Sequence, residues 1–217
     1  MMAEMGMPVD KPWTLADLLF TFSMWVVMMV GMMAAAAAPV VILFSATQLG
    51  RSGRRKPVTV LVFGAGYLAV WVGFSAFAAV AQWILHDAAL LSPTMGASSS
   101  YVGGAILCAA GAYQLTPLKH ACLKHCRTPL GFLMAHWRDG RLGALQMGMR
   151  HGAYCLGCCW ALMCVLFVVG VMNLVWVAAL ALLVLLEKVG PAGEIVARAA
   201  GVAMILAGLL ILGGTGR

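Results

Sequence analysis

The sequence predicts an all-α, polytopic membrane protein with about six transmembrane helices and a structured cytoplasmic loop between the third and the fourth. Of its 217 residues, 63% are hydrophobic and only 10% are charged, and the mean hydropathy is +0.97. Soluble domains carry about 25% charged residues, so this chain lacks the polar surface that a soluble fold needs. Its apolar residues form long unbroken runs and not the alternating pattern of a membrane barrel, which leaves helices as the structure that lipid permits.

Five apolar runs give the predicted spans, since about 20 apolar residues cross a bilayer. The runs cover residues 18–49, 58–85, 101–115, 154–186 and 195–212. The run 154–186 would be about 50 Å long as one helix, which exceeds one bilayer. We therefore predict a hairpin that turns near residues 170–173, with a first helix that starts near Leu142 and a short second helix. The first run is long enough to tilt or to break near Pro39.

Basic residues predict the orientation of these spans. With six spans, the lysines and arginines of three connections fall on one side, while residues 86–100, on the other side, contain none. By the positive-inside rule the basic side is the cytoplasm, so both termini lie outside. We expect one membrane domain over residues 1–217, with an outer tail at 1–16 and an interfacial loop at 116–141. The basic residues are Arg51, Arg54, Arg55, Lys56, Lys119, Lys124, Arg127, Arg138, Arg141, Lys188 and Arg198.

The loop 116–141 carries its own helix signals. Pro117 ends the third span, and residues 120–126 can form a short helix. Thr128 before Pro129 is typical of a helix start, with the proline at the first helical position. The apolar residues that follow suit the membrane interface. The net charge of +7 reflects such loops, and we expect the lipid bilayer, and no nucleic acid, as a partner.

Histidine and cysteine are concentrated where the fourth span begins, although an apolar helix in lipid has no need of them. At 100° per residue, His151, Cys155 and Cys158 share one helical face, and Cys159 lies at its edge. Imidazole and thiolate groups on one face are typical of a soft metal site. We therefore predict that these four residues are metal ligands.

A second group precedes it in the interfacial loop. Cys122, His125 and Cys126 are spaced i, i+3 and i+4, which again is one helical face. Both groups fall near the cytoplasmic boundary of the membrane, so they could complete a single site. Thiolate and imidazole ligands suit Cu(I), with zinc as a second choice. Basic residues nearby would lower the thiol pKa values and favour thiolates.

Two other interpretations of the cysteines remain open. Cysteine is also a small apolar packing residue, which is the preferred interpretation for the isolated Cys108 and Cys164. A disulfide between Cys155 and Cys158 is the other, although a reducing cytoplasm disfavours it.

Methionines form a stripe in the first span. Met24, Met28 and Met32 are spaced by four residues, as are Met29 and Met33. A thioether is a soft ligand that selects Cu(I), so we predict Met24, Met28 and Met32 as ligands; the alternative is that they only fill space. The tail adds Met1, Met2, Met5 and Met7.

Several polar residues lie close to these groups in the predicted arrangement. Glu187 can be a ligand, a proton carrier or the ion-pair partner of the adjacent Lys188, and the ion pair is the preferred interpretation. Tyr113 and Gln114 are expected to supply hydrogen bonds near the cysteines.

The same residues carry a resemblance to a known family. Over most of residues 20–210 the chain resembles the bacterial membrane family called domain of unknown function 2182. The resemblance implies a metal-binding integral membrane protein of the copper chaperone kind, in the bacterial cytoplasmic membrane. The similar stretches are Met24–Met33, Gly111–Lys119, Cys122–Pro129, His151–Met163, Gly170–Asn173, Trp176 and Leu186–Lys188.

We therefore expect Cu(I) handling, meaning transport, delivery or assembly of a cuproenzyme, through the Cys/His site and the methionine-rich first helix. The alternative is an accessory or structural subunit of a larger membrane enzyme complex, and a third option is a membrane thiol oxidoreductase that uses Cys155 and Cys158. The sequence holds no Walker loop, dinucleotide fingerprint, serine elbow or HExxH motif. An enzymatic role stays open, but we expect a binding function.

Overall fold

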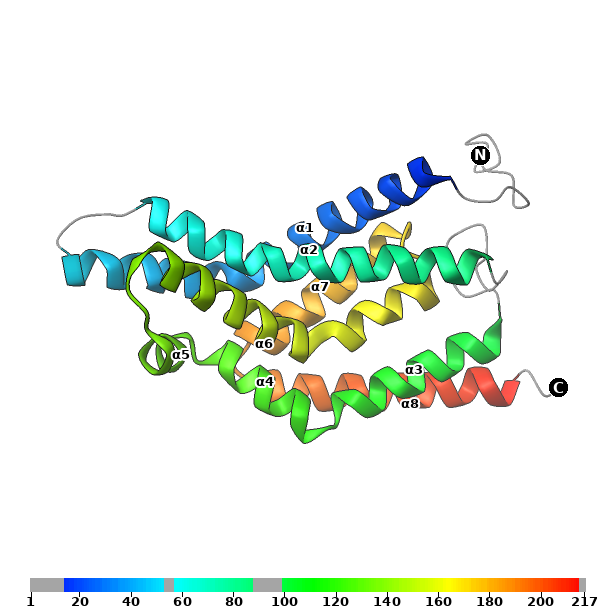
Figure 1. Cartoon of the computed structure of the whole chain (residues 1–217). Coiled ribbons are helices and arrows are strands. Elements are labelled where there is room, and N and C mark those ends of the chain that lie inside the picture. Colours follow the sequence, from blue (N-terminus) through cyan, green and yellow to red (C-terminus); the bar gives the residue numbers. More distant parts are fainter. Residues whose placement is uncertain (1–13, 53–56, 88–98, 215–217) are drawn as a thin grey trace.

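The computed structural model describes residues 14–52, 57–87 and 99–214, and this part of the chain forms eight α-helices and no strand. It is an elongated bundle in which most helix axes follow one direction (Figure 1). The predicted all-α class is therefore confirmed. The helices are α1 (Leu15–Ser52), α2 (Pro57–Asp87), α3 (Ser100–Gln114), α4 (Pro117–Arg127), α5 (Pro129–His136), α6 (Gly140–Val169), α7 (Leu174–Val189) and α8 (Gly193–Gly214).

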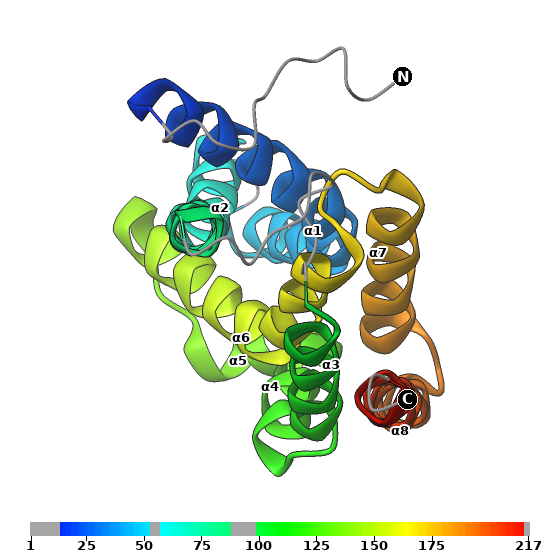
Figure 2. The same cartoon turned by 90° about the vertical axis from the view of Figure 1, so that its right-hand side faces the viewer.

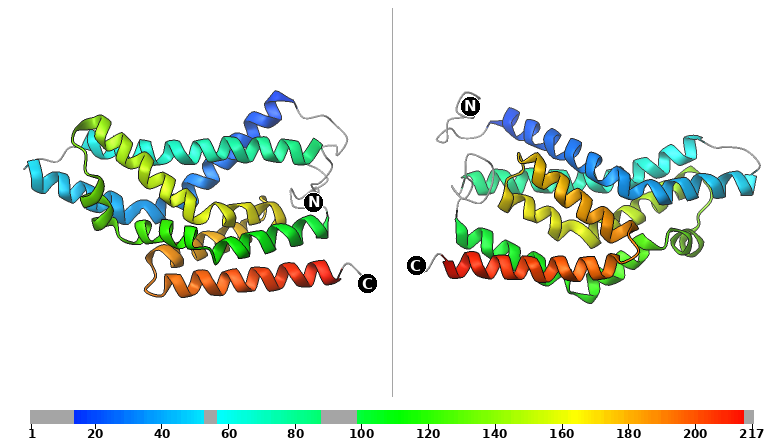
Figure 3. Two further views of the ribbon diagram at one scale, coloured as in Figure 1. Left: turned by 60° about the horizontal axis from the view of Figure 1, so that its bottom comes forward. Right: turned by 180° about the vertical axis from the view of Figure 1, so that it is seen from behind.

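Helix α6 occupies a central place in the bundle. Viewed along the bundle, it lies between α2 on one side and α3 with α4 on the other (Figure 2), and it contacts all three. Helices α3 and α8 run beside each other, and α1 passes over α2 and α7 (Figure 3). The start of α1 and the end of α8 lie at the same end of the bundle, opposite α5 (Figure 1). This arrangement makes α6 the element on which a shared site can form.

Four helices, α1, α2, α6 and α8, are long and apolar enough to cross a membrane, judged by length and composition. Helices α3 and α7 have 15 and 16 residues. They are about 22–24 Å long and so are shorter than the roughly 30 Å hydrocarbon layer. Six spans therefore remain a prediction, whereas four candidate spans are observed.

The predicted hairpin between α6 and α7 is confirmed. Helix α6 ends at Val169 and α7 begins at Leu174. Gly170 has a φ of 87°, which glycine adopts without a steric penalty. The side chain of Asn173 accepts hydrogen bonds from the first backbone amides of α7 at 3.2 and 3.4 Å. These contacts end one helix and start the next within four residues.

The predicted interfacial loop also forms its two helices. Thr116 caps α4 by accepting a hydrogen bond from the Lys119 amide at 3.3 Å, and Pro117 takes the first helical position. Helix α5 begins at Pro129 directly after Thr128, as predicted. In the first span, α1 continues through Pro39 to Ser52. Several residues of the predictions lie outside the described residues, namely Met1, Met2, Met5, Met7, Arg54, Arg55, Lys56 and positions 88–98 of the outer connection.

Helices α2 and α6 approach each other through glycines. A Cβ atom added at Gly148 would lie 2.0 Å from the Phe63 carbonyl oxygen, and one added at Gly66 would lie 2.3 Å from the Leu145 carbonyl oxygen. Small residues let membrane helices pack backbone against backbone in this way. The close contact sets α6 so that His151, Gly152 and Cys155 are buried, with Cys155 next to Tyr67.

Candidate metal centre

The middle of α6 places three sulfur atoms in the core. Cys155, Cys158 and Cys159 are each at most 2% exposed. The thiols of Cys158 and Cys159 donate hydrogen bonds to the backbone carbonyl of Cys155 at 3.1 and 2.9 Å. Because positions i, i+3 and i+4 share a helical face, one face of α6 presents all three thiols to the neighbouring helices. Cys159, predicted at the edge of this face, is as buried as the other two.

Helix α4 adds two more sulfur atoms. The Sγ of Cys126 lies 3.9 Å from the Sγ of Cys158. Cys122 lies beside Gly157, where an added Cβ would be 2.9 Å from the Cys122 Sγ. The Tyr113 hydroxyl donates a hydrogen bond to the Gly157 carbonyl and so ties α3 to the same turn of α6. The two cysteine clusters of the sequence therefore meet, and we call Cys122, Cys126, Cys155, Cys158 and Cys159 the thiol group.

A buried lysine enters the thiol group from the end of α7. The Lys188 ammonium lies 2.8 Å from the Cys155 Sγ and 3.8 Å from the Cys159 Sγ, and the residue is 6% exposed. The Tyr67 hydroxyl lies 3.0 Å from the Cys155 Sγ and donates a hydrogen bond to the Met33 carbonyl at 3.2 Å. Cys155 thus contacts polar groups from two other helices, the Lys188 ammonium as a donor and the Tyr67 hydroxyl oxygen as an acceptor, and sequence reasoning singled out neither residue for this role.

The predicted ion pair between Glu187 and Lys188 is wrong. Glu187 instead binds the Lys119 ammonium at 2.6 Å, and both side chains are at most 1% exposed. It also accepts a hydrogen bond from the Gln114 amide at 2.8 Å. Adjacent residues on a helix point about 100° apart, so Glu187 faces α3 and α4 while Lys188 faces α6. The expected hydrogen bonding by Gln114 and Tyr113 is confirmed.

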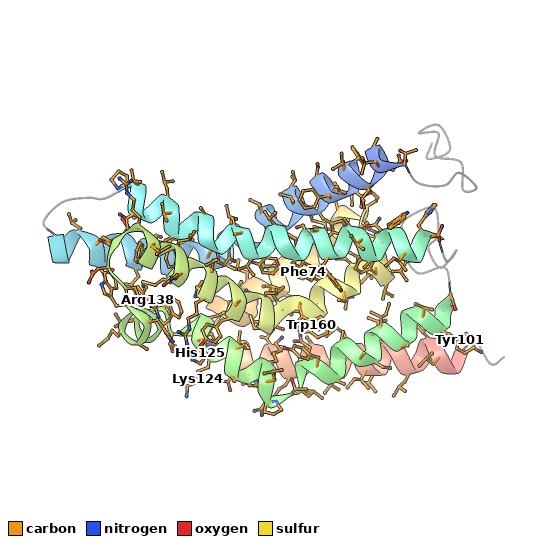
Figure 4. The ribbon with its side chains drawn as sticks, viewed as in Figure 1. Phe74, Tyr101, Lys124, His125, Arg138 and Trp160 are labelled. Atoms are coloured by element: carbon orange, nitrogen blue, oxygen red, sulfur yellow. The ribbon has the colours of Figure 1, made fainter. Side chains whose placement is uncertain are left out.

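The two predicted histidine ligands have aromatic neighbours. The His125 ring stacks on Tyr154, with centroids 4.4 Å apart, and its Nδ1 lies 2.8 Å from the Ala121 carbonyl oxygen. Figure 4 shows His125 on α4, next to Lys124. His151 is buried between Tyr67 and Phe132, and its Nδ1 has no hydrogen-bond partner in the described part of the chain. An unpartnered buried nitrogen near the thiols is a donor atom that a bound metal could use.

The methionine stripe of α1 belongs to the same core as the thiol group. Met32 is buried, and Met24 and Met28 are half-buried. Met29 and Met33, which were not predicted as ligands, are fully buried. The structure therefore places soft thioether atoms in the core beside α2 and α7. Their role as ligands remains a prediction.

The thiols of α4, a helix outside the four candidate spans, have shifted pKa values. Hydrogen bonds with Cys155 and Cys158, followed by burial, raise the pKa of the Cys126 thiol well above its usual value. Burial, followed by the nearby Cys158, raises the pKa of the Cys122 thiol. The expectation that nearby basic residues lower thiol pKa values is wrong for both. The physical reason is that hydrogen bonds and burial outweigh the lowering effect of Lys188 on the Cys126 pKa, and that burial dominates at Cys122.

Within residues 14–52, 57–87 and 99–214, no three His, Cys, Asp or Glu side chains already stand in the arrangement of a metal site. The donor set nevertheless fits a soft monovalent metal, because thiols from two helices and an unpartnered imidazole nitrogen lie in one buried region. The ten predicted ligands therefore remain predictions. They are Met24, Met28, Met32, Cys122, His125, Cys126, His151, Cys155, Cys158 and Cys159.

Comparison with known proteins adds one finding. A family model described as PpoB2, copper chaperone, matches residues 22–211, which is most of the chain. No curated protein and no solved structure matched the chain. The copper chaperone part of the resemblance seen in the sequence is confirmed, whereas the name domain of unknown function 2182 remains a prediction.

Proposed function

Because the chain belongs to the PpoB2 copper chaperone family, we propose that it is a membrane protein that binds Cu(I) as cargo at the thiol group and passes it to a recipient protein. The observation that carries this proposal is the meeting of Cys126 on α4 with Cys155 and Cys158 on α6. Thiolates are the soft ligands that Cu(I) prefers. A ligand pair shared by two helices can be opened by a small displacement of one of them, which suits a protein that must release its metal.

The charge of the site favours Cu(I) over zinc. A buried charge is stable only when it is compensated. Cu(I) held by two thiolates carries a net charge of −1, and the buried Lys188 ammonium beside Cys155 would neutralise it. Zn²⁺ held by two thiolates is already neutral and would leave that ammonium uncompensated. The lysine therefore supports a monovalent cargo.

We place the thiol group at the cytoplasmic boundary of the membrane. Helix α6 has 30 residues and is about 45 Å long, so part of it must extend beyond the roughly 30 Å hydrocarbon layer. The exposed Lys124 and Arg138 lie toward one end of the bundle (Figure 4). With six spans, this basic end is cytoplasmic and both termini are outside, in a bacterial inner membrane. Met24, Met28 and Met32 would then lead Cu(I) from the outer side toward the thiols.

Copper titration of the purified protein tests the proposal. The protein is prepared anaerobically in detergent and titrated with Cu(I) against a competing chelator. Replacing Cys126 and Cys158 together by serine should weaken Cu(I) binding by about a hundredfold or more. Loss of a residue that only supports a metal ligand already lowers metal affinity by about 10–100-fold, and loss of the ligand itself should lower it at least as much. The matched control replaces Cys108 on α3 and Cys164 on α6, which lie outside the thiol group.

The expected result is tight binding in the wild type and the control, with loss in the Cys126 and Cys158 variant. Equal binding by all three proteins would place the copper elsewhere and overturn the site. The recipient is proposed to be a cuproenzyme or another subunit of a membrane complex, and co-purification with the copper-loaded protein at a fixed stoichiometry would identify it.

A further inference from the structure

A pocket of about 360 Å³ lies between the end of α5 and the first half of α6, apart from the thiol group. Its polar lining comes from His136, Arg138, Gln146 and Arg150, and Met149 forms part of its apolar wall. Arg138 marks the end of the bundle where this pocket lies (Figure 4). Nothing in the proposed copper chemistry uses these residues.

The pocket is strongly basic. Its lining includes two arginines, Arg138 and Arg150, and no acidic residue, while Asp139 is adjacent to Arg138 in the chain. Asp139 accepts a hydrogen bond from the Trp137 indole at 2.9 Å. Arg138 donates one hydrogen bond from Nη1 to Gln146 at 2.6 Å, which leaves its other donors available. Arg150 is exposed and lines the same pocket. Two guanidinium groups at one opening are suited to an oxyanion such as phosphate.

The surroundings of the pocket are apolar. Met149, in its wall, is 39% exposed. On the neighbouring α5, Leu130 and Met134 are 54% and 76% exposed. Trp137, which also lines the pocket, is a residue type enriched at membrane interfaces. A ligand with a phosphate and an apolar part would satisfy both the guanidinium groups and these exposed side chains.

We propose that this pocket binds a phosphate-bearing anion, with the headgroup of an acidic phospholipid as its natural source. Basic pockets at the cytoplasmic ends of membrane helices hold anionic lipid headgroups in this manner. The site is independent of copper binding. Since α5 and the start of α6 form its walls, a bound lipid would fix the segment that follows α4 against the membrane surface.

Native mass spectrometry of the detergent-purified full chain tests the proposal. The protein is exposed to phosphatidylglycerol, to phosphatidylcholine, or to inorganic phosphate alone. The pocket variant carries Arg138→Gln and Arg150→Gln. The matched control carries Lys124→Gln and Arg141→Gln, which remove two exposed charges at the same end but outside the pocket lining.

The wild type should retain phosphatidylglycerol and not phosphatidylcholine. The pocket variant should lose about 25-fold in affinity, since each cation beside an anionic headgroup contributes about fivefold. The control should change by less than about threefold, because its charges are screened from the pocket.

Binding of inorganic phosphate with the same variant pattern supports the anion site and assigns it to a free anion. Equal losses in both variants, or no retention of any phosphate compound by the wild type, overturn the proposal. Cu(I) binding should be unchanged in both variants, which separates this site from the thiol group.

Discussion

The Lys188 ammonium lies 2.8 Å from the Cys155 sulfur inside the bundle, and its side chain is almost fully buried. A lysine is seldom buried unless its charge is compensated. Here the neighbours that can compensate it are sulfur atoms, because the nearest carboxylate in sequence, Glu187, is bound to Lys119. The positive charge of Lys188 is therefore part of the thiol group's environment.

Replacement of Lys188 should weaken copper binding while leaving the fold intact. Lys188→Met keeps the length of the side chain but leaves the copper dithiolate with an uncompensated negative charge, so Cu(I) affinity should fall roughly 10–100-fold. Lys188→Arg keeps the charge and should bind with an intermediate affinity. The measurement is chelator competition, with Lys124→Met on the exposed face as the control. Unchanged affinity in Lys188→Met would show that the ammonium has no part in the site.

Removal of one partner from the buried Lys119 and Glu187 pair should destabilise the bundle. Glu187→Gln leaves a buried ammonium without its carboxylate, so the free energy of unfolding should fall by about 3 kcal/mol. Adding Lys119→Met to this variant should recover much of the loss, since neither charge is then buried. Unfolding in a detergent series measures both changes. A double variant whose free energy of unfolding is no higher than that of Glu187→Gln alone would contradict this account.

Gly148 and Gly64 should respond differently to alanine. Gly148→Ala forces a Cβ onto the Phe63 carbonyl oxygen, so it should lower the free energy of unfolding by about 2 kcal/mol or more. Gly64→Ala meets no atom within 4 Å and should raise it by about 0.5–1 kcal/mol through helix propensity. Thermal unfolding in one detergent compares the pair. Similar values for both variants would mean that α2 and α6 are not packed as closely as described.

Gly157→Ala should change the Cu(I) affinity more than the free energy of unfolding. Its added Cβ would press on the Cys122 sulfur, which is the movable end of a side chain and can shift away. The free energy of unfolding should therefore change by less than about 1 kcal/mol. If Cys122 is a ligand, Cu(I) affinity should fall roughly tenfold. Gly131→Ala, where the nearest atoms are 3.7 Å or more from the added Cβ, is the control. Unchanged copper binding would remove Cys122 from the ligand set.

Local signals in the sequence were enough to predict the helices around the site. Thr128 before Pro129 predicted the start of α5, and the length of the apolar run 154–186 required the turn after Val169. The helix predicted over residues 120–126 forms as well, although it begins earlier, at Pro117. These predictions succeeded because helix caps and span lengths depend on residues close together in the chain.

Contacts between distant segments were predicted less well. Helical periodicity places His125 on the same face as Cys126, yet the imidazole stacks on Tyr154 because an aromatic surface from α6 is available there. The contact between Lys188 and Cys155 depends on how α7 packs against α6, which no local pattern encodes. The number of spans could not be predicted with certainty for the same reason. Helices α3 and α7 are short, and their depth in the membrane depends on the helices around them.

The glycine contacts between α2 and α6 limit which of the helices that carry the thiol group can move. With main chain lying on main chain at Gly66 and Gly148, neither helix can slide or tilt without breaking the interface along its length. Three of the five thiols therefore lie on α6, a helix that is held in place by its packing on α2. The other two belong to α4, an eleven-residue helix between two turns. If the thiol group holds Cu(I) as proposed, displacement of α4 from α6 is the movement that would open the site.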